Sequence, residues 1–231
     1  MDELRGTEIL RHKAADSGWV AAPGQRPGVD EAIDRHIQEH FGPVDYVVHE
    51  IIGHHATVHV YVVAPTTERP YLTLVTSGMS ELPMAVPEEL GITPYTELML
   101  ALPANWPLPG TADPDAPGAW PIRLLKQTAR MPHEYATWLG IWHSVPNGDP
   151  AEPYAPGTSF AGVVVTPMLN VPPEARVIEV GDGTTIDLLA LIPLHADEMK
   201  LKLSRGTDAL IAGLDRGKVS ELLDPDRPSF A

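Results

Sequence analysis

The amino-acid sequence predicts a single α+β domain, in which helices flank a mixed, largely antiparallel central sheet. Residues 58–62 alternate valine with a histidine and a tyrosine, which is the two-residue period of a strand with two distinct faces. Between residues 33 and 41 an apolar side chain recurs every four positions, as on one face of a helix. An Asp-Gly pair at 182–183 lies between two apolar runs, where it favours a hairpin turn. With no internal repeat and no evident linker, one domain is expected.

The ends of the chain have weaker patterns than its middle. Residues 1–28 lack clear periodicity and end in a run rich in proline and glycine, so we expect a loosely ordered N-terminal arm. Residues 29–226 form the predicted domain, and residues 227–231 form a tail. The segment 224–231 is expected to be irregular.

The first half of the domain should contain one helix and then strands. Asp30 is the expected N-cap of the helix, and Gly42-Pro43 ends it. Gly53 supplies the turn between the first two strands. The four expected strands cover residues 44–52, 56–64, 71–76 and 96–102.

The second half alternates helical and strand patterns. Residues 120–138 are mostly helical, and Pro132 is expected to end or kink that helix, which makes 133–138 a separate short helix. Helical periodicity returns over 195–214, where Thr207 is the expected N-cap of a second segment. The three strands expected between these helices cover residues 161–166, 176–180 and 184–192. Twenty-five prolines require many loops, the clearest of them at 21–28, 103–121 and 145–157.

Composition restricts the function classes. The chain has 16 Lys and Arg against 31 Asp and Glu, a formal net charge of −15, which disfavours nucleic acid and anionic lipid and favours a basic protein partner. The absence of cysteine excludes disulfides, thiolate metal sites and a cysteine nucleophile. No apolar run is long enough to span a bilayer, and the acidic start shows no secretory signal, so we expect a cytoplasmic protein.

A histidine-rich segment supplies the main enzymatic alternative. His49, Glu50 and His54 invite comparison with the zinc motif H-E-x-x-H, in which the two histidines share one helix face. Here the histidines are five positions apart on a segment with strand character, so helical geometry would not bring them together. A surface cluster with His55 and His59 is still conceivable across a hairpin, and it defines a metal-dependent hydrolase as the alternative function.

Two further patterns give weaker indications of chemistry. His143, Ser144 and Asp149 contain the residue types of a hydrolytic triad, but neighbours on an extended segment point to opposite faces, and the chain has no G-x-S-x-G elbow. The glycine-containing run 181–185 is followed by strand and not by a helix N-terminus, so it predicts a hairpin and not a phosphate site.

Several segments together resemble the suppressor of fused (SUFU) domain family, particularly its bacterial members. The resemblance runs in order from about residue 30 to residue 226. The matching stretches are 71–80 (YLTLVTSGMS), 97–103 (ELMLALP) ending at Trp106, 120–126 (WPIRLLK), 132–135 (PHEY), 138–140 (WLG), 142–150 (WHSVPNGDP), and 191–194 (LIPL) with 197–199 (DEM).

The resemblance implies a protein-binding module and not an enzyme, and it implies no cofactor. Bacterial relatives resemble immunity proteins of polymorphic toxin systems, so the expected function is an immunity-type inhibitor that occludes a basic toxin or another basic protein. Polar side chains on loops are the expected contact surface, through hydrogen bonds and charge complementarity. These candidates are Ser77, Met79, Ser80, His133, Glu134, His143, Asn147 and Asp149. The sequence leaves the oligomeric state and the identity of the partner open.

Overall fold

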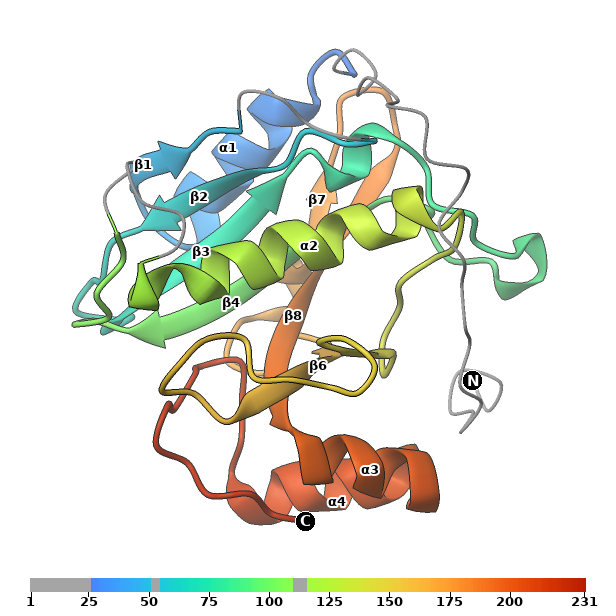
Figure 1. Cartoon of the computed structure of the whole chain (residues 1–231). Coiled ribbons are helices and arrows are strands. Elements are labelled where there is room, and N and C mark those ends of the chain that lie inside the picture. The colour runs from blue at the N-terminus through green and yellow to red at the C-terminus, as the bar shows by residue number, and fades with distance from the viewer. Residues whose placement is uncertain (1–25, 51–54, 110–115) are drawn as a thin grey trace.

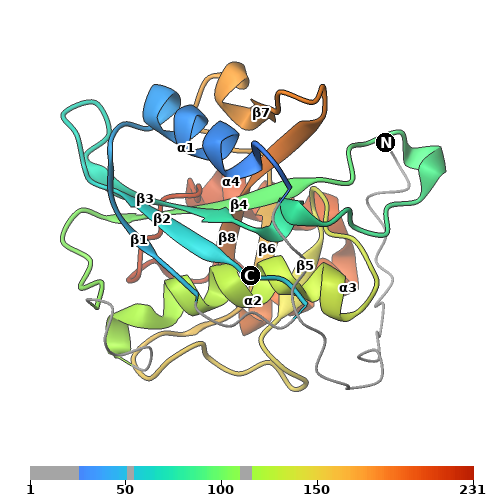
Figure 2. The same ribbon diagram turned by 90° about the horizontal axis from the view of Figure 1, so that it is seen from above.

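The fold consists of one mixed sheet with helices on both faces, which confirms the predicted class (Figure 1). The computed structural model describes residues 26–50, 55–109 and 116–231. Nearly all of the predicted 1–28 arm lies outside this range. Figure 2 shows α1 (Val29–His40) and α2 (Trp120–Glu134) on opposite sides of the strands. Two further helices, α3 (Ala196–Arg205) and α4 (Thr207–Gly217), follow the last strand.

The sheet has eight strands in the order β1-β2-β3-β4-β8-β6-β5, with β7 paired to β8 outside this path. All pairs between strands are antiparallel except β4 with β8, which run parallel. The strands are β1 (Val44–Val48), β2 (His59–Val63), β3 (Tyr71–Ser77), β4 (Thr96–Pro103), β5 (Ser144–Pro146), β6 (Phe160–Thr166), β7 (Val177–Glu179) and β8 (Thr185–His195). No helix in the described ranges is both long and apolar enough to cross a bilayer.

Four details of the sequence-based prediction were wrong. Helix α1 begins at Val29 with Gly28 as its N-cap, because Asp30 is turned toward β3 and accepts a hydrogen bond from the Ser77 hydroxyl at 2.7 Å. Likewise α4 takes Gly206 as its N-cap, and the predicted cap Thr207 is its first residue.

The other two corrections concern proline-containing segments. Helix α2 continues through Pro132 to Glu134, because this proline is buried near the helix end, where few further bonds depend on it. Residues 135–138 form a turn and extended chain instead of a separate helix. The predicted loop 145–157 begins within a strand, since β5 pairs with β6 and places Val145 opposite Val163.

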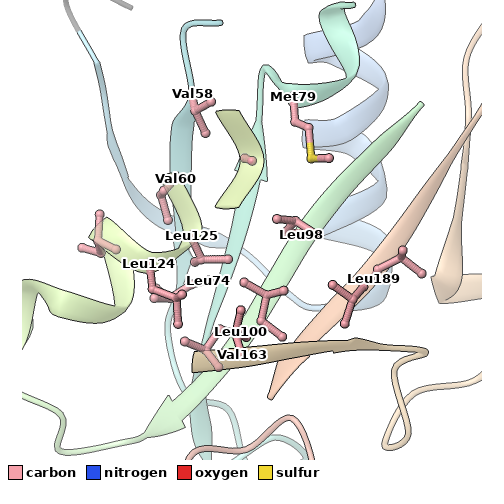
Figure 3. Close-up of a cluster of buried hydrophobic side chains, with 14 of the residues drawn as sticks. Val58, Val60, Leu74, Met79, Leu98, Leu100, Leu124, Leu125, Val163 and Leu189 are labelled. Atoms are coloured by element: carbon pink, nitrogen blue, oxygen red, sulfur yellow. The ribbon is translucent and has the colours of Figure 1, made fainter. Parts of the chain in front are cut away.

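Alternation along the strands divides the core between the two faces of the sheet. Leu74 faces α2, while its neighbour Val75 faces α1. Figure 3 shows the α2 side, where side chains from β2, β3 and β4 meet Leu124 and Leu125. Helices α3 and α4 cover the far part of the sheet on the α1 face, over Val164, Ile192 and Leu194. A strand with two buried faces explains why β4 and β6 are almost continuously apolar.

An ionisable side chain, Glu97, lies wholly within this core. Glu97 of β4 is 0% exposed, and its carboxylate accepts hydrogen bonds from the Thr76 hydroxyl (2.5 Å), the Gly78 N–H (3.0 Å), and both the N–H (2.9 Å) and hydroxyl (2.7 Å) of Ser80. Gly78 has φ +119°, and a Cβ there would lie 1.9 Å from the Thr57 carbonyl oxygen, so only glycine fits. Burial raises the pKa of Glu97, and these hydrogen bonds oppose the rise.

The C-terminal segment is irregular, as predicted, but it is fixed to the sheet. Beyond Ala190, β8 no longer pairs with β4, and residues 221–223 bond instead to Ala101 of β4. Arg227 forms a bidentate ion pair with buried Glu198, at 2.5 and 2.7 Å, and donates to the Pro193 carbonyl at 2.8 Å. Pro193 lacks an N–H and is tolerated in β8, because its backbone edge away from β6 faces the C-terminal segment and not another strand.

The Glu97 network predicts a pH-dependent stability. Glu97→Ala removes the acceptor of four buried donors and should lower the free energy of unfolding by about 3–5 kcal/mol.

Glu97→Gln keeps most of the contacts of this side chain without its charge. Since the folded-state pKa is raised, the wild-type protein loses stability as pH rises from the ordinary glutamate range toward that pKa, and Glu97→Gln lacks this loss. Urea unfolding of the wild type and Glu97→Gln at several pH values checks this prediction. A stability difference between these two proteins that stays the same across pH would contradict it.

The tail contact predicts a large effect from a residue outside all helices and strands. Arg227→Ala leaves Glu198 buried without its counter-charge and should cost about 3–5 kcal/mol of unfolding free energy. Arg216→Ala, an exposed arginine of α4, is the matched control and should change stability by less than about 0.5 kcal/mol. Denaturant unfolding of both variants makes the comparison, and equal effects would refute a structural role for the tail.

Candidate functional site

A groove of about 240 Å³ lies between the C-terminal half of α2 and the edge strand β5. On the helix side its lining includes Gln127, Met131 and Glu134, which are spaced by four and then three residues and therefore share one stripe of α2. On the strand side it includes Val145 and Asn147. Tyr154 from the following loop also lines it. The groove therefore combines apolar surface with a few polar groups, as ligand and peptide sites do.

Two of the residues predicted from sequence, Glu134 and Asn147, meet at this groove. The Asn147 side chain donates to the Glu152 carbonyl at 2.7 Å, and the Glu152 N–H donates to the Asn147 carbonyl at 2.9 Å. These reciprocal bonds close the loop that carries Asp149, which is exposed. The loop that carries Asn147 and Asp149 is therefore closed by its own hydrogen bonds.

The electrostatics of the groove favour a cation. Glu134 is the last residue of α2, where unpaired carbonyl groups and the helix dipole already place negative partial charge. Asp149 and Glu152 add two exposed carboxylates on the neighbouring loop. A lysine or arginine side chain entering the groove would meet Glu134 in its lining, with further negative charge on the loop that follows β5.

An aromatic stack supports the groove from beneath. The rings of Trp120 and Tyr154 lie parallel, 7° apart in plane with centroids at 5.6 Å, and Trp106 meets Trp120 edge-on. Burial raises the pKa of Tyr154, so its hydroxyl stays protonated. Tyr154 and Met131 line the groove but are not among the residues predicted from sequence. The four-and-three spacing along α2 could have indicated Met131, whereas no local pattern places Tyr154 beside the helix.

Three predicted contact residues lie in the interior. Ser77, Met79 and Ser80 are each 0% exposed, so in this conformation a partner cannot reach them. The physical reason is the buried carboxylate of Glu97, which Ser80 binds directly, and the apolar cluster that Met79 joins (Figure 3). Their role in the structure is to end β3 and form the short helix η2 (Met79–Glu81).

The two predicted histidines point inward and are only partly exposed. His133 Nε2 lies 2.9 Å from the Met79 carbonyl, which joins the end of α2 to η2. The ring of His143 packs against Trp138 with centroids 4.3 Å apart. Burial lowers the pKa of both histidines, so both are held toward the neutral form. Of the eight predicted residues, Glu134, Asn147 and Asp149 are the ones that a partner can readily contact.

The histidine segment forms a different arrangement from the metal site considered above. Glu50 pairs with Arg130 of α2 and accepts from the Val58 N–H at 2.9 Å, while its own N–H donates to His59 Nδ1. His49 is exposed and meets the His59 ring at 5.0 Å. His55 is half-buried, and His54 lies outside the described residues. In the described part of the chain, no three metal-ligating side chains of the His, Cys, Asp or Glu type come together.

A second hollow, of about 160 Å³, lies beside this segment, and Asp30, His59 and Glu81 contribute to its wall. Burial raises the pKa of Glu81 and lowers that of His59. Glu81 accepts from the Arg26 backbone N–H, and Asp30 accepts from Ser77, so these carboxylates already serve contacts within the fold.

Comparison with known proteins assigns the family. The family model described as "Suppressor of fused protein (SUFU)" matches residues 54–228. No curated protein matches the chain significantly.

Solved structures agree with that match. A putative SUFU homolog from Neisseria gonorrhoeae superposes with a TM-score of 0.61 at 17% identity, over 88% of this chain and 97% of that one. A chain of the Sufu–Fu complex gives 0.61 at 14% identity, over 90% and 93%. Suppressor of Fused from Drosophila gives 0.59 at 14% identity, over 88% of this chain and 51% of that one. At these identities the structures share the fold, and the family model covers most of the sequence; the chain belongs to the suppressor of fused family.

Proposed function

We propose that this chain is a protein-binding module that acts as an immunity-type inhibitor, neutralising a basic toxin domain or another basic protein by occlusion. The contact surface of the proposal is the groove between α2 and β5 with the neighbouring loop, and its key side chains are Glu134, Asn147 and Asp149. Binding of this kind needs no cofactor, and the cytoplasm is the proposed setting.

The observation that carries the proposal is the meeting of Glu134 and Asn147 at one groove of about 240 Å³. The two residues come from different elements, yet both were candidates for a contact surface before their positions were known. The groove offers apolar area from Met131 and Val145 beside carboxylates and a helix C-terminus, which suits a lysine or arginine flanked by apolar residues. The net charge of −15 would steer such a partner toward the protein.

The family supports a binding role. One structural neighbour comes from a crystal structure of "the Sufu-Fu complex", in which a protein with this fold is bound to a protein partner. Another neighbour is bacterial and spans almost the same length as this chain. Occlusion also suits the groove, because it offers apolar and acidic surface to a partner on the outside of the protein.

Affinity capture from the native cytoplasm tests the class of partner. At low salt we expect one dominant basic protein to co-purify, and most of it should be lost as salt rises, because the Debye length falls from about 10 Å at 0.1 M to about 3 Å at 1 M. Mass spectrometry identifies the partner, and a growth assay with and without this chain then tests neutralisation. A dominant partner that is acidic, or retention that does not change with salt, would contradict the proposal.

Charge reversal tests the position of the surface. Glu134→Lys combined with Asp149→Lys should weaken binding of the captured partner at least about tenfold, which corresponds to about 1.4 kcal/mol. Glu174→Lys combined with Glu179→Lys is the control matched in charge, because these exposed glutamates of η5 (Pro173–Arg176) and β7 lie on the α1 side of the sheet. Titration calorimetry at one fixed salt concentration measures all three proteins. If the double variant binds as tightly as the control, the groove is not the contact surface.

A further inference from the structure

A serine hydroxyl and a lysine amine meet at the edge of the sheet, on the face away from the groove. Lys202 of α3 lies 3.0 Å from Ser144 of β5, from Nζ to Oγ, although the two residues are 58 positions apart in the sequence. Successive strand residues face opposite sides, so Val145 lines the groove beside α2 while Ser144 faces α3. The pair is therefore a separate site from the proposed binding surface.

The surroundings of Lys202 make it an unusual lysine. Lys202 is only 8% exposed, and no carboxylate in the described ranges forms an ion pair with it. A hydroxyl compensates a buried ammonium far less than a carboxylate does, so burial makes this amine easier to deprotonate than an exposed lysine. Burial accordingly lowers the pKa of Lys202. His143 is the titratable group that faces it, and its own pKa is lowered by burial and by the nearby lysine charge.

Ser144 is the accessible member of the pair. It is half-buried, and among the described residues β5 is the last strand on its side of the sheet, with no strand paired to its outer edge. A neutral amine at hydrogen-bond distance is the group that a serine needs as general base, and serine–lysine pairs are a known variant of nucleophilic catalysis. The hydrogen bond therefore joins a reachable nucleophile to a buried base.

We propose that Ser144 is a nucleophile activated by Lys202, able to accept an acyl group from an activated ester. In this step Lys202 Nζ takes the hydroxyl proton as Ser144 Oγ attacks the ester carbonyl carbon. The tetrahedral intermediate then collapses, the bond from carbon to the leaving oxygen breaks, and the leaving alkoxide takes the proton from Lys202. The products are an acyl-serine and a free alcohol, and Lys202 returns to its neutral form.

The partner of Ser144 is not the histidine beside it in the sequence. His143 and Ser144 were judged unable to form a triad because neighbours on a strand point apart, and the structure agrees, since His143 packs on Trp138. The base comes instead from a helix far along the chain. Sequence spacing could not indicate it.

The probe is p-nitrophenyl acetate, with release of p-nitrophenol and peptide mapping as the two measurements. We expect one acetyl group on Ser144, absent from Ser144→Ala. Lys202→Met should acetylate at least about 100-fold more slowly, the smaller end of the effect of a general base. The wild-type rate should rise with pH around a midpoint below 10.5, the ordinary value for lysine.

Two controls separate this chemistry from loss of structure. Lys202→Arg keeps a cation and a donor but cannot lose its proton near neutral pH, so it should fold and still fail to acetylate. Ser204→Ala removes another hydroxyl, from an exposed serine of α3, and should react like the wild-type protein. An absence of acetyl on Ser144, or acetylation at the wild-type rate in Lys202→Arg, overturns the proposal.

Discussion

The buried carboxylate of Glu97 is the constraint on which much of the structure depends. Its donors come from the end of β3 and from η2, so a single side chain of β4 determines where β3 stops and how the chain turns. His133 then joins η2 to the end of α2 through the Met79 carbonyl. Since Glu134 follows directly and lines the groove, the position of the proposed contact surface traces back to a charge that no partner can reach.

This network also explains where sequence-based prediction worked and where it did not. Alternation predicted β2 because the sheet has two faces with separate cores, and four-residue spacing predicted α1. The same reasoning placed Ser77 and Ser80 on the surface, because polar loop residues usually contact solvent or ligands. Their hydroxyls are buried with an acceptor instead. Which acceptor a serine hydroxyl binds depends on the tertiary fold, so the local sequence does not predict it.

Long-range pairing accounts for the remaining differences. Strand β5 is three residues long and contains Pro146, so its local pattern resembles a loop, and only pairing with β6 makes it a strand. The C-terminal segment lacks any periodic pattern, yet Arg227 pairs with Glu198 in the interior. Glu134 and Asn147 are candidates from sequence because both are polar and lie at the ends of elements. Their meeting at one groove depended on how α2 crosses the sheet.

A groove held in this way is formed before a partner arrives. Its helix side is tied through His133 to η2, and its loop side is closed by the reciprocal bonds of Asn147 and Glu152. Tyr154 in its lining is held by stacking on Trp120. A preformed surface spares a complex the entropy of ordering loops and side chains, so more of the contact energy remains as affinity. For the proposed inhibitor, the buried polar network would therefore matter to binding as much as the exposed carboxylates.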